Sequence, residues 1–261
     1  MIRDCFTLTG KNALVTGSTR GLGAAIAVAL AEAGANVAVH GRSNSGEDTC
    51  SRVSQRGQKT FFIAGDISDG GVCSTLVEKT VAEFGTLDIL INNAGTIRRA
   101  PAAAYSLEDW DHLIAANLSS VFRLSQLAGR HMLERSSGGK IVNIASLLSF
   151  QGGILVPAYA VAKGGVAQLT KAFANEWARY GINVNAIAPG YMETDKHRGV
   201  AERPKAQPAN LGTNSSGQMG HAARRRWGGC VSILAGSQLH SRSCPDGRWR
   251  LARAVTLLMG K

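Results

Sequence analysis

A tyrosine and a lysine stand four residues apart in the segment Y-A-V-A-K, where Tyr159 precedes Lys163. On a helix, this spacing places both side chains on one face. A phenol with its ordinary pKa of about 10 is a poor base at neutral pH. A neighbouring ammonium would favour the phenolate by Coulomb attraction, so the pair is suited to general acid and base catalysis. The same two residues can also align by coincidence on an amphipathic helix, and their meaning depends on the motifs that accompany them.

The segment T-G-S-T-R-G-L-G, residues 16–23, has the glycine spacing of a dinucleotide-binding turn. An apolar run at 13–15 precedes it and a helical pattern follows it, which is the strand, turn and helix context that the motif requires. Glycines let the backbone approach a pyrophosphate, and the N-terminus of the helix offers free N–H groups. The candidate cofactor contacts in this turn are Gly17, Thr19, Arg20, Gly21 and Gly23.

The first two-thirds of the chain alternates short β-rich runs with longer amphipathic stretches. We expect strands at 13–15, 36–40, 60–64, 89–92, 140–144 and 182–188, and helices at 21–33, 45–56, 71–84, 107–118, 120–135 and 158–180. This alternation predicts an α/β fold, a doubly wound parallel sheet of the Rossmann type with helices on both faces. We expect a single catalytic domain over residues 1–195, followed by an atypical C-terminal tail over 196–261.

Polar residues follow several of the expected strands, at the edge of the sheet where such folds bind ligands. Asp66 follows the third strand, and Asn93 and Gly95 lie in N-N-A-G after the fourth. The N-N-A-G segment can support the glycine turn or line the cofactor cleft. Ser146 follows the fifth strand, where its hydroxyl can bind a substrate oxygen or serve as a turn or cap residue. Asn117, a poor helix former inside a helical segment, could relay protons to the lysine or cap a local break.

Four arginines suggest where anionic groups could bind. An acidic residue at the end of the second strand would accept the ribose hydroxyls of NAD, but this chain has H-G-R there. Arg42 and Arg20 could meet a 2′-phosphate, so the sequence favours NADP and leaves NAD possible. Arg98 and Arg99 follow N-N-A-G, where the planar guanidinium fork could bind a substrate carboxylate. The alternative is a pair of solvated surface arginines.

Composition excludes several classes of protein. At 261 residues and 44% hydrophobic, the chain can build one sizeable α/β core. It contains no apolar stretch long enough for a membrane span and no evident signal peptide, so we expect a cytoplasmic protein with no membrane partner. The five cysteines are scattered without the spacing of metal ligands, and we expect no metal site.

The motifs occur in a fixed order over residues 8–195: T-G-x-x-x-G-x-G, N-N-A-G, the Asn, the Ser, Y-x-x-x-K and P-G. This part of the chain resembles the short-chain dehydrogenase/reductase family. The resemblance implies an NAD(P)-dependent enzyme with Ser146, Tyr159 and Lys163 as catalytic triad and Asn117 as fourth member. It also implies cofactor contacts by Lys163 and by three further residues: Asp66 at the adenine ring, Pro189, and Thr194 at the nicotinamide carboxamide. A homotetramer or homodimer is implied if the C-terminus is intact.

Longer stretches, such as N-N-A-G-T-I-R-R-A-P and I-A-S-L-L-S-F-Q-G-G-I-L-V-P-A-Y, are similar to one branch of that family. This branch comprises the 2-deoxy-D-gluconate 3-dehydrogenases, also called 2-dehydro-3-deoxy-D-gluconate 5-dehydrogenases, and is mostly associated with NAD. The similarity implies interconversion of a secondary hydroxyl and a ketone on a small deoxy sugar acid. Gluconate 5-dehydrogenase or 3-oxoacyl reductase activity on the same scaffold is the alternative.

The net charge of +11 is concentrated in the tail: residues 1–195 hold 17 Lys and Arg against 16 Asp and Glu, whereas 196–261 hold 12 against 2. When back-translated codons are read one nucleotide later, 214–221 permit I-P-A-G-R-W-G and 245–251 permit T-V-D-G-G-W, which resemble the family's C-terminus. We therefore interpret the tail as an out-of-frame translation rather than a nucleic-acid-binding segment. We expect it to contain no clear strand and to be disordered or poorly packed, with only short apolar pieces such as 231–235 or 255–259 able to collapse onto the sheet. An inactive, cofactor-binding relic is the alternative function.

Overall fold

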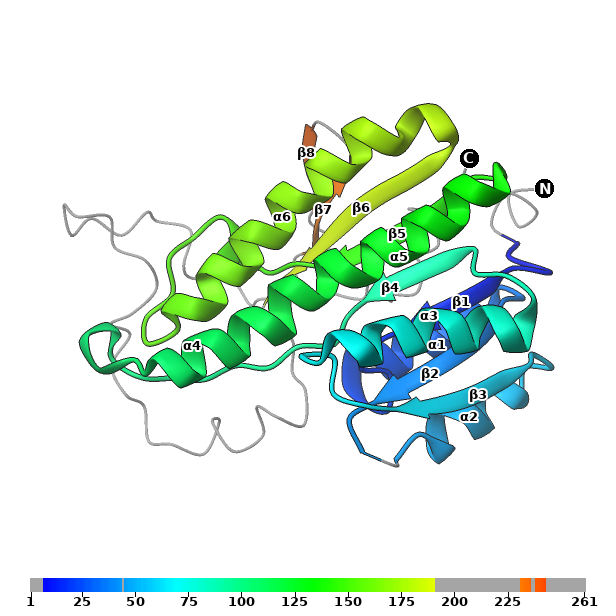
Figure 1. Ribbon diagram of the computed structural model, residues 1–261, viewed down its shortest axis with the longest axis horizontal. Helices are drawn as coiled ribbons and strands as arrows, with labels where there is room; N and C mark the ends of the chain where they lie inside the picture. Colours follow the sequence, from blue (N-terminus) through cyan, green and yellow to red (C-terminus); the bar gives the residue numbers. More distant parts are fainter. Residues whose placement is uncertain (1–6, 44, 191–230, 236–237, 243–261) are drawn as a thin grey trace.

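The computed structural model describes residues 7–43, 45–190, 231–235 and 238–242, and within these ranges the strands form one sheet in the order β3-β2-β1-β4-β5-β6-β7-β8 (Figure 1). Its first six strands are β1 (Asn12–Val15), β2 (Asn36–Gly41), β3 (Thr60–Ala64), β4 (Ile89–Asn92), β5 (Gly139–Ile144) and β6 (Ile182–Pro189). These six strands all pair in parallel. The sheet therefore confirms the parallel core of the predicted fold, with strand bounds within one residue of those expected.

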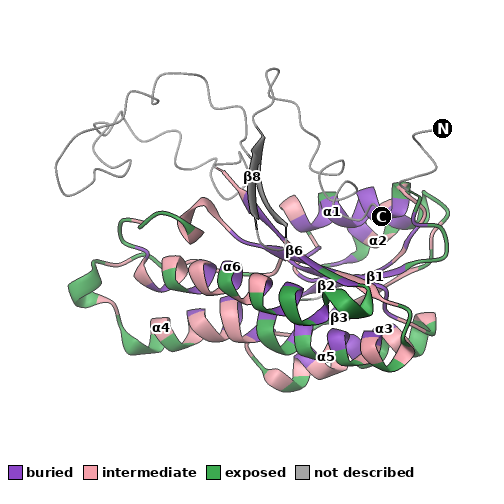
Figure 2. Cartoon of the chain, turned by 90° about the horizontal axis from the view of Figure 1, so that it is seen from above, coloured by how far each residue is buried: buried purple, intermediate pink, exposed green. Residues whose placement is uncertain are grey.

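Helices cover both faces of this sheet. They are α1 (Gly21–Glu32), α2 (Glu47–Ser54), α3 (Gly70–Phe84), α4 (Leu107–Ile114), α5 (Ser120–Arg135) and α6 (Pro157–Trp177), with short helical turns at Ala102–Ala104, Leu147–Ser149 and Ala178–Tyr180. Figures 1 and 2 show α1 and α2 on one face and α3, α5 and α6 on the other. The doubly wound arrangement is confirmed.

The two largest hydrophobic clusters lie on opposite faces of the sheet. Ile26 and Leu30 of α1 belong to the first cluster, and Leu76 of α3 and Leu124 of α5 belong to the second. Strand β1 lies between them and is buried along its whole length, as Figure 2 shows for the centre of the sheet. A parallel strand covered on both faces needs apolar side chains in both directions, which is why Asn12 is followed by the apolar run Ala13-Leu14-Val15.

The expected helix at 107–118 is interrupted in the structure. α4 ends at Ile114, a π-helical turn follows over Ala115–Ser119, and α5 begins at Ser120. A π-helical turn accommodates one additional residue and is frequent at functional sites. Among the described residues, no helix combines the length and the apolar character needed to cross a membrane.

The prediction that the tail contains no clear strand is wrong for two segments. β7 (Val231–Ala235) pairs antiparallel with β6, and β8 (Gln238–Arg242) pairs antiparallel with β7. The physical reason is that the free edge of β6 offers unpaired N–H and C=O groups, which a short apolar segment can satisfy. The outer edge of β6 is therefore paired. The other residues of the tail lie outside the described ranges.

Candidate active site

The glycine turn connects β1 to α1 and depends on glycine at three positions. Gly17 and Gly21 have φ angles of +62° and +56°, in the left-handed region that favours glycine. A Cβ atom on Gly23 would lie 2.2 Å from the Gly17 carbonyl oxygen, and one on Gly17 would lie 2.8 Å from the Ala94 Cα atom. The backbone of the turn is thus packed too closely to admit side chains, as a surface for a pyrophosphate requires.

Asn93 holds this turn from the side of β4. Its Nδ2 donates hydrogen bonds to the carbonyl oxygens of Thr16, at 2.9 Å, and Gly17, at 3.0 Å. The Thr16 hydroxyl in turn accepts from the backbone N–H groups of Asn93 and Ala94, each at 3.0 Å. Of the two roles that the sequence left open for N-N-A-G, the geometry favours support of the glycine turn.

Two residues at the end of β2, His40 and Gly41, help to position the glycine turn and were not identified from the sequence. The ring of His40, which is 2% exposed, accepts the Gly17 N–H at Nδ1 over 3.1 Å and contacts the Gly65 carbonyl oxygen through Nε2 at 3.0 Å. Burial lowers the pKa of His40. A Cβ on Gly41 would lie 2.4 Å from the Thr19 Cγ2 atom. The available signal was a polar residue closing the otherwise apolar run V-A-V-H.

A cavity of about 260 Å³ lies at the outer end of the turn. It is lined by Thr19, Arg20, Arg42, Ser43 and Ser45, which offer two guanidinium groups and three hydroxyls. Both arginines are exposed to solvent. This set of donors fits a phosphate group, since guanidinium forks and hydroxyls donate to its oxygens. The residues present therefore fit a dinucleotide whose adenosine carries a 2′-phosphate.

Asp66 follows β3 after Gly65, next to the contact of Gly65 with His40. Its Oδ1 accepts hydrogen bonds from the backbone N–H of Ser68 at 2.9 Å and from the Ser68 hydroxyl at 2.8 Å. The backbone bond from Ser68 is the main cause that lowers the pKa of Asp66, and His112 and Arg42 add to it by their charge. The carboxylate is thus ionised and held in position at neutral pH.

Ser146, Tyr159 and Lys163 come together at the carboxyl end of β5. Ser146 precedes the helical turn Leu147–Ser149, while Tyr159 and Lys163 lie on α6. The Lys163 Nζ atom lies 5.8 Å from the centroid of the Tyr159 ring and donates a 2.5 Å hydrogen bond to the Ile144 carbonyl oxygen. The Ser149 hydroxyl donates to the Lys163 carbonyl oxygen at 2.7 Å, which ties α6 to the segment that carries Ser146.

The expected effect of Lys163 on Tyr159 is corrected by the structure. Burial raises the pKa of Tyr159, while a hydrogen bond with Ser146 and the charge of Arg99 act to lower it. The Lys163 ammonium is itself almost fully buried, which lowers the pKa of Lys163 to about 8. Burial disfavours the charged form of both groups, so the net shift of the Tyr159 pKa is upward, opposite to the direction expected from the sequence.

Asn117 is fully buried within the π-helical turn. Its Oδ1 accepts the backbone N–H of Thr96 and its Nδ2 donates to the Thr96 carbonyl oxygen, each at 2.8 Å. A Cβ on Gly95 would lie 2.7 Å from the same Oδ1. Asn117 thus fixes the segment after N-N-A-G, and its side chain makes no hydrogen bond to Lys163 among the described residues.

The two arginines after N-N-A-G differ in their surroundings. The Nε atom of Arg98 lies 3.5 Å from an Asp109 carboxylate oxygen, so this guanidinium already has an anionic partner. The charge of Arg99 acts on Tyr159 instead. Pro189 ends β6 at the same edge of the sheet, whereas Thr194 lies outside the described residues.

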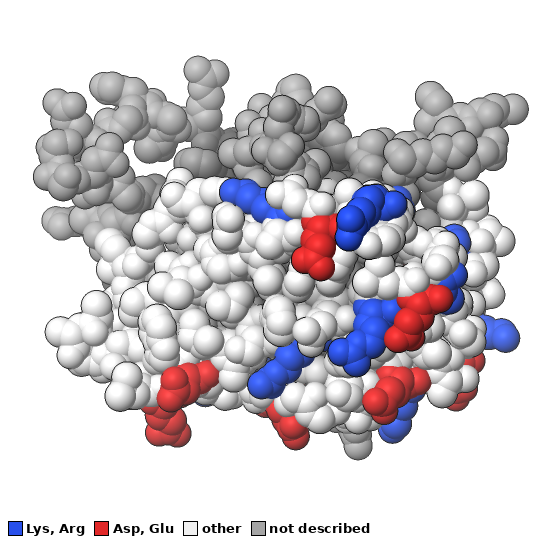
Figure 3. Space-filling model, turned by 45° about the horizontal axis from the view of Figure 1, so that its top comes forward, with Lys and Arg blue, Asp and Glu red and all other residues white. Residues whose placement is uncertain are grey.

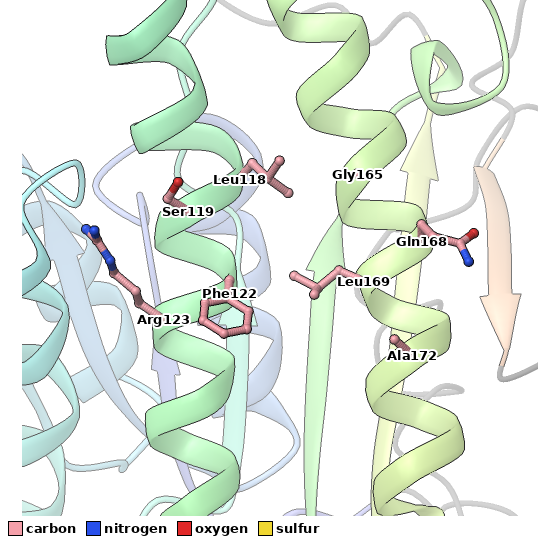
Figure 4. Close-up of a pocket in the computed structure, with 8 residues that line it drawn as sticks. All are labelled: Leu118, Ser119, Phe122, Arg123, Gly165, Gln168, Leu169 and Ala172. Atoms are coloured by element: carbon pink, nitrogen blue, oxygen red, sulfur yellow. The ribbon is translucent and has the colours of Figure 1, made fainter.

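The remaining features of the described residues are a second cavity, the distribution of surface charge and the lack of a metal-binding cluster. A cavity of about 680 Å³ lies along α5 and α6 and is lined by Leu118, Ser119, Phe122, Arg123, Gly165, Gln168, Leu169 and Ala172 (Figure 4). Basic and acidic side chains are interspersed on the face shown in Figure 3, without a single basic patch. Within the described ranges, no group of three or more His, Cys, Asp or Glu residues is placed to hold a metal ion.

Comparison with known proteins identifies the family. A sequence model of the short chain dehydrogenases matches residues 11–205. A protein of Dickeya dadantii named 2-dehydro-3-deoxy-D-gluconate 5-dehydrogenase is 49% identical over 195 residues, which cover 75% of this chain and 77% of that protein.

Solved structures agree. A gluconate 5-dehydrogenase from Burkholderia cenocepacia J2315, in complex with NADP and tartrate, has a TM-score of 0.72 and 38% identity over 78% of this chain and 80% of that one. An Agrobacterium tumefaciens protein, provisionally named 2-deoxy-D-gluconate 3-dehydrogenase and bound to NADP, has a TM-score of 0.70 and 45% identity over 76% and 78%. This chain belongs to the short-chain dehydrogenase family.

Proposed function

We propose that this chain is an NAD(P)-dependent oxidoreductase that interconverts a secondary hydroxyl and a ketone on a small deoxy sugar acid. The observation that carries the proposal is the meeting of Ser146, Tyr159 and Lys163 in a fold whose glycine turn borders a cavity lined by two arginines. The relatives named above support the substrate class, because they are named for sugar acids and one of them binds tartrate, a hydroxy acid. The proposed cofactor contacts are Gly17, Thr19, Arg20, Gly21, Gly23, Arg42, Asp66, Asn93, Gly95, Lys163, Pro189 and Thr194.

The proposed mechanism assigns one task to each residue of the triad. When bound, the nicotinamide would supply the two-electron oxidant or reductant. In the direction of reduction, Tyr159 donates its proton to the carbonyl oxygen of the substrate, and its raised pKa keeps that proton available at neutral pH. The Ser146 hydroxyl donates a hydrogen bond to the same oxygen and orients it. Lys163 would bind the ribose hydroxyls, and Asn117, whose side chain is engaged with Thr96, would complete a proton relay to Lys163 through a bound water.

The cofactor preference that we propose is for NADP. Arg20 and Arg42 line the cavity at the outer end of the turn, and both solved relatives described above contain NADP. Arg42→Asp should therefore shift the ratio of NADP to NAD affinities by at least about tenfold toward NAD, which is roughly 1.4 kcal/mol. Arg130→Asp, on an exposed position of α5, is the matched control. An unchanged ratio in the Arg42 variant would refute this assignment.

Within the proposed substrate site, Arg99 is the better candidate for binding the carboxylate, since Arg98 already lies beside Asp109. A charge-assisted hydrogen bond contributes about 1.5–3 kcal/mol. Arg99→Ala should thus raise the KM for the acid at least about tenfold, whereas Arg98→Ala should have a smaller effect. Equal effects of the two substitutions would contradict the distinction drawn between them.

The activity is tested with a panel of substrates. 2-Deoxy-D-gluconate, 2-dehydro-3-deoxy-D-gluconate, gluconate and a 3-oxoacyl thioester are each assayed with NADP and NAD by nicotinamide absorbance. Tyr159→Phe should lower kcat at least about 100-fold, and Tyr180→Phe, an exposed tyrosine beyond α6, should leave it unchanged. Failure of every sugar acid would overturn the proposed substrate class. Turnover of the thioester alone would favour the oxoacyl reductase instead.

The C-terminal tail, residues 196–261, is proposed to be an out-of-frame replacement of the family's substrate loop and last strand. The alternative of an inactive relic finds no support in the comparisons, which include named dehydrogenases. The chain as given and a frame-corrected version should be expressed side by side. Limited proteolysis should cleave the former after about residue 195 and leave a cofactor-binding core. Equal protease resistance of the two tails would refute the proposal.

A homodimer or homotetramer is proposed from the surface of α5 and α6. The cavity there is lined by Leu118, Phe122 and Leu169, and the Phe122 ring is 41% exposed (Figure 4). Apolar patches of this kind are found where subunits meet. Light scattering should give a mass of two or four chains, and Phe122→Asp should reduce this mass.

We also propose a cytoplasmic location, with which the free thiols of Cys50 and Cys73 agree. Fractionation of cells tests this location.

A further inference from the structure

His40 connects two segments that are far apart in the sequence. Its backbone N–H donates to the Ser18 hydroxyl at 3.0 Å, and its carbonyl oxygen accepts the Ser18 N–H at 2.8 Å. Its ring adds the contacts with Gly17 and Gly65, and Gly65 immediately precedes Asp66. The same residue therefore touches the glycine turn through both backbone and side chain, and touches the segment after β3 through the far side of its ring.

The partners of the ring determine its tautomer. The backbone N–H of Gly17 can only donate, so Nδ1 must carry a free lone pair. The carbonyl oxygen of Gly65 can only accept, so Nε2 must carry the proton. Both ring nitrogens are thus satisfied in a neutral imidazole that is 2% exposed. A second proton on Nδ1 would face the Gly17 N–H, donor against donor.

We propose that His40, as the neutral tautomer with its proton on Nε2, is a positioning residue that fixes the glycine turn relative to the segment carrying Asp66. It sets the affinity for the dinucleotide without touching the reacting atoms. The inference rests on the proposed function, because the turn and Asp66 are the proposed contacts to the pyrophosphate and to the adenine ring of the cofactor. Protonation of the ring would remove the Gly17 contact and release the turn.

The charges around the ring bear on its titration. Burial lowers the pKa of His40, while the Gly65 carbonyl and the Asp66 carboxylate oppose this. Arg42 and His112 act in turn on Asp66. Because the ordinary pKa of histidine is about 6.5 and burial places it lower here, the contact with Gly17 is intact at neutral pH and is lost only under acidic conditions.

Two substitutions separate the contacts of the ring. His40→Asn can keep an acceptor near the position of Nδ1, whereas His40→Gln keeps a donor near Nε2 and loses the acceptor for Gly17. The Kd for NADPH, measured by fluorescence on the full chain, should stay within about threefold in the Asn variant and rise at least about tenfold in the Gln variant. His131→Gln, at a partly buried histidine that contacts Leu87, is the matched control and should bind as the wild type does.

The kinetic and pH readouts distinguish positioning from general destabilisation. The kcat of His40→Gln at saturating cofactor should stay within about twofold of wild type, with the loss confined to the KM for NADPH. Below about pH 6.5, the Kd of the wild type should rise more steeply than that of His40→Asn. Titration of the 2′-phosphate of the cofactor affects both proteins alike and cancels in this comparison.

Long-range ¹H–¹⁵N spectra of the labelled wild type give a direct test that no variant's folding can obscure. They should show His40 neutral, with its proton on Nε2, at pH 7. A Gln variant that folds and binds NADPH as tightly as wild type, or a ring that is protonated or carries its proton on Nδ1, would overturn the inference alone. A wild type that binds neither NADPH nor NADH would overturn the proposed function and this inference with it.

Discussion

Replacing Lys163 with methionine should remove activity and yet leave the protein at least as stable as the wild type at pH 7. Lys163 as a residue is 4% exposed, and burial lowers the pKa of its ammonium from 10.5 to about 8. Because the charged form is disfavoured inside the protein, a neutral side chain of similar length relieves a cost of folding. Activity should fall at least about 100-fold, since the variant lacks the group beside Tyr159.

The magnitude follows from the two pKa values. A difference of about 2.5 units corresponds to about 3 kcal/mol that burial of the charge costs at pH 7. Loss of the hydrogen bond from Lys163 to the Ile144 carbonyl oxygen offsets about 1 kcal/mol of this gain. The methionine variant should thus be more stable at pH 7 by up to about 2 kcal/mol, an upper bound because methionine packs differently from lysine.

The pH dependence of stability tests whether burial of the Lys163 charge destabilises the folded protein. The folded-state pKa lies below the unfolded-state value, so the unfolded chain binds more protons between about pH 8 and 10.5, and stability rises with pH across that window. From pH 7 to 9.5 the wild type should gain about 2 kcal/mol relative to Lys163→Met in urea denaturation. Lys171→Met, on the same helix, controls for the substitution itself. A difference between wild type and Lys163→Met that does not change with pH would refute the reasoning.

Three further predictions follow from the turn and the core. Gly23→Ala should abolish NADPH binding, because its Cβ would lie 2.2 Å from the Gly17 oxygen, and an unchanged Kd would show that the turn can move aside. Asn93→Ala should raise the NADPH Kd about tenfold by removing two hydrogen bonds to the turn, and tight binding by this variant would argue against the support role. Cys73, whose pKa burial raises to about 11, should resist a thiol reagent at pH 8 until the protein is unfolded, as peptide mapping would show, and labelling of the native enzyme would contradict its burial.

The parallel part of the fold could be predicted because its signals are local. Strands such as β3 and β4 are apolar runs with polar ends, and their bounds agree with those expected from the sequence. The π-helical turn Ala115–Ser119 could not be predicted, because one additional residue in a helix barely changes the apolar period. The antiparallel direction of β7 relative to β6 could not be predicted either, since the run V-S-I-L-A carries no information on whether it pairs parallel or antiparallel.

The electrostatics of the site were harder to predict than its residues. Spacing alone indicated that Tyr159 and Lys163 share a helix face, and the structure places them together. Spacing says nothing of burial, which determines the direction of both pKa shifts. Likewise, the partners of His40 come from two other strand ends, and only the register of β2 with its neighbours brings them within hydrogen-bond distance.

The glycine turn is held from both sides by the two strands that flank β1. β2 contributes the His40 ring, which accepts the Gly17 N–H, and β4 leads into Asn93, whose amide donates to the Gly17 carbonyl oxygen. One peptide unit on each side of the Gly17 Cα is therefore fixed by a side chain from a different neighbour. Because a glycine has no side chain of its own to restrain it, contacts from neighbouring strands such as these two hold the conformation of the turn. The geometry offered to a pyrophosphate is thus a consequence of the register of three central strands, rather than of the glycines alone.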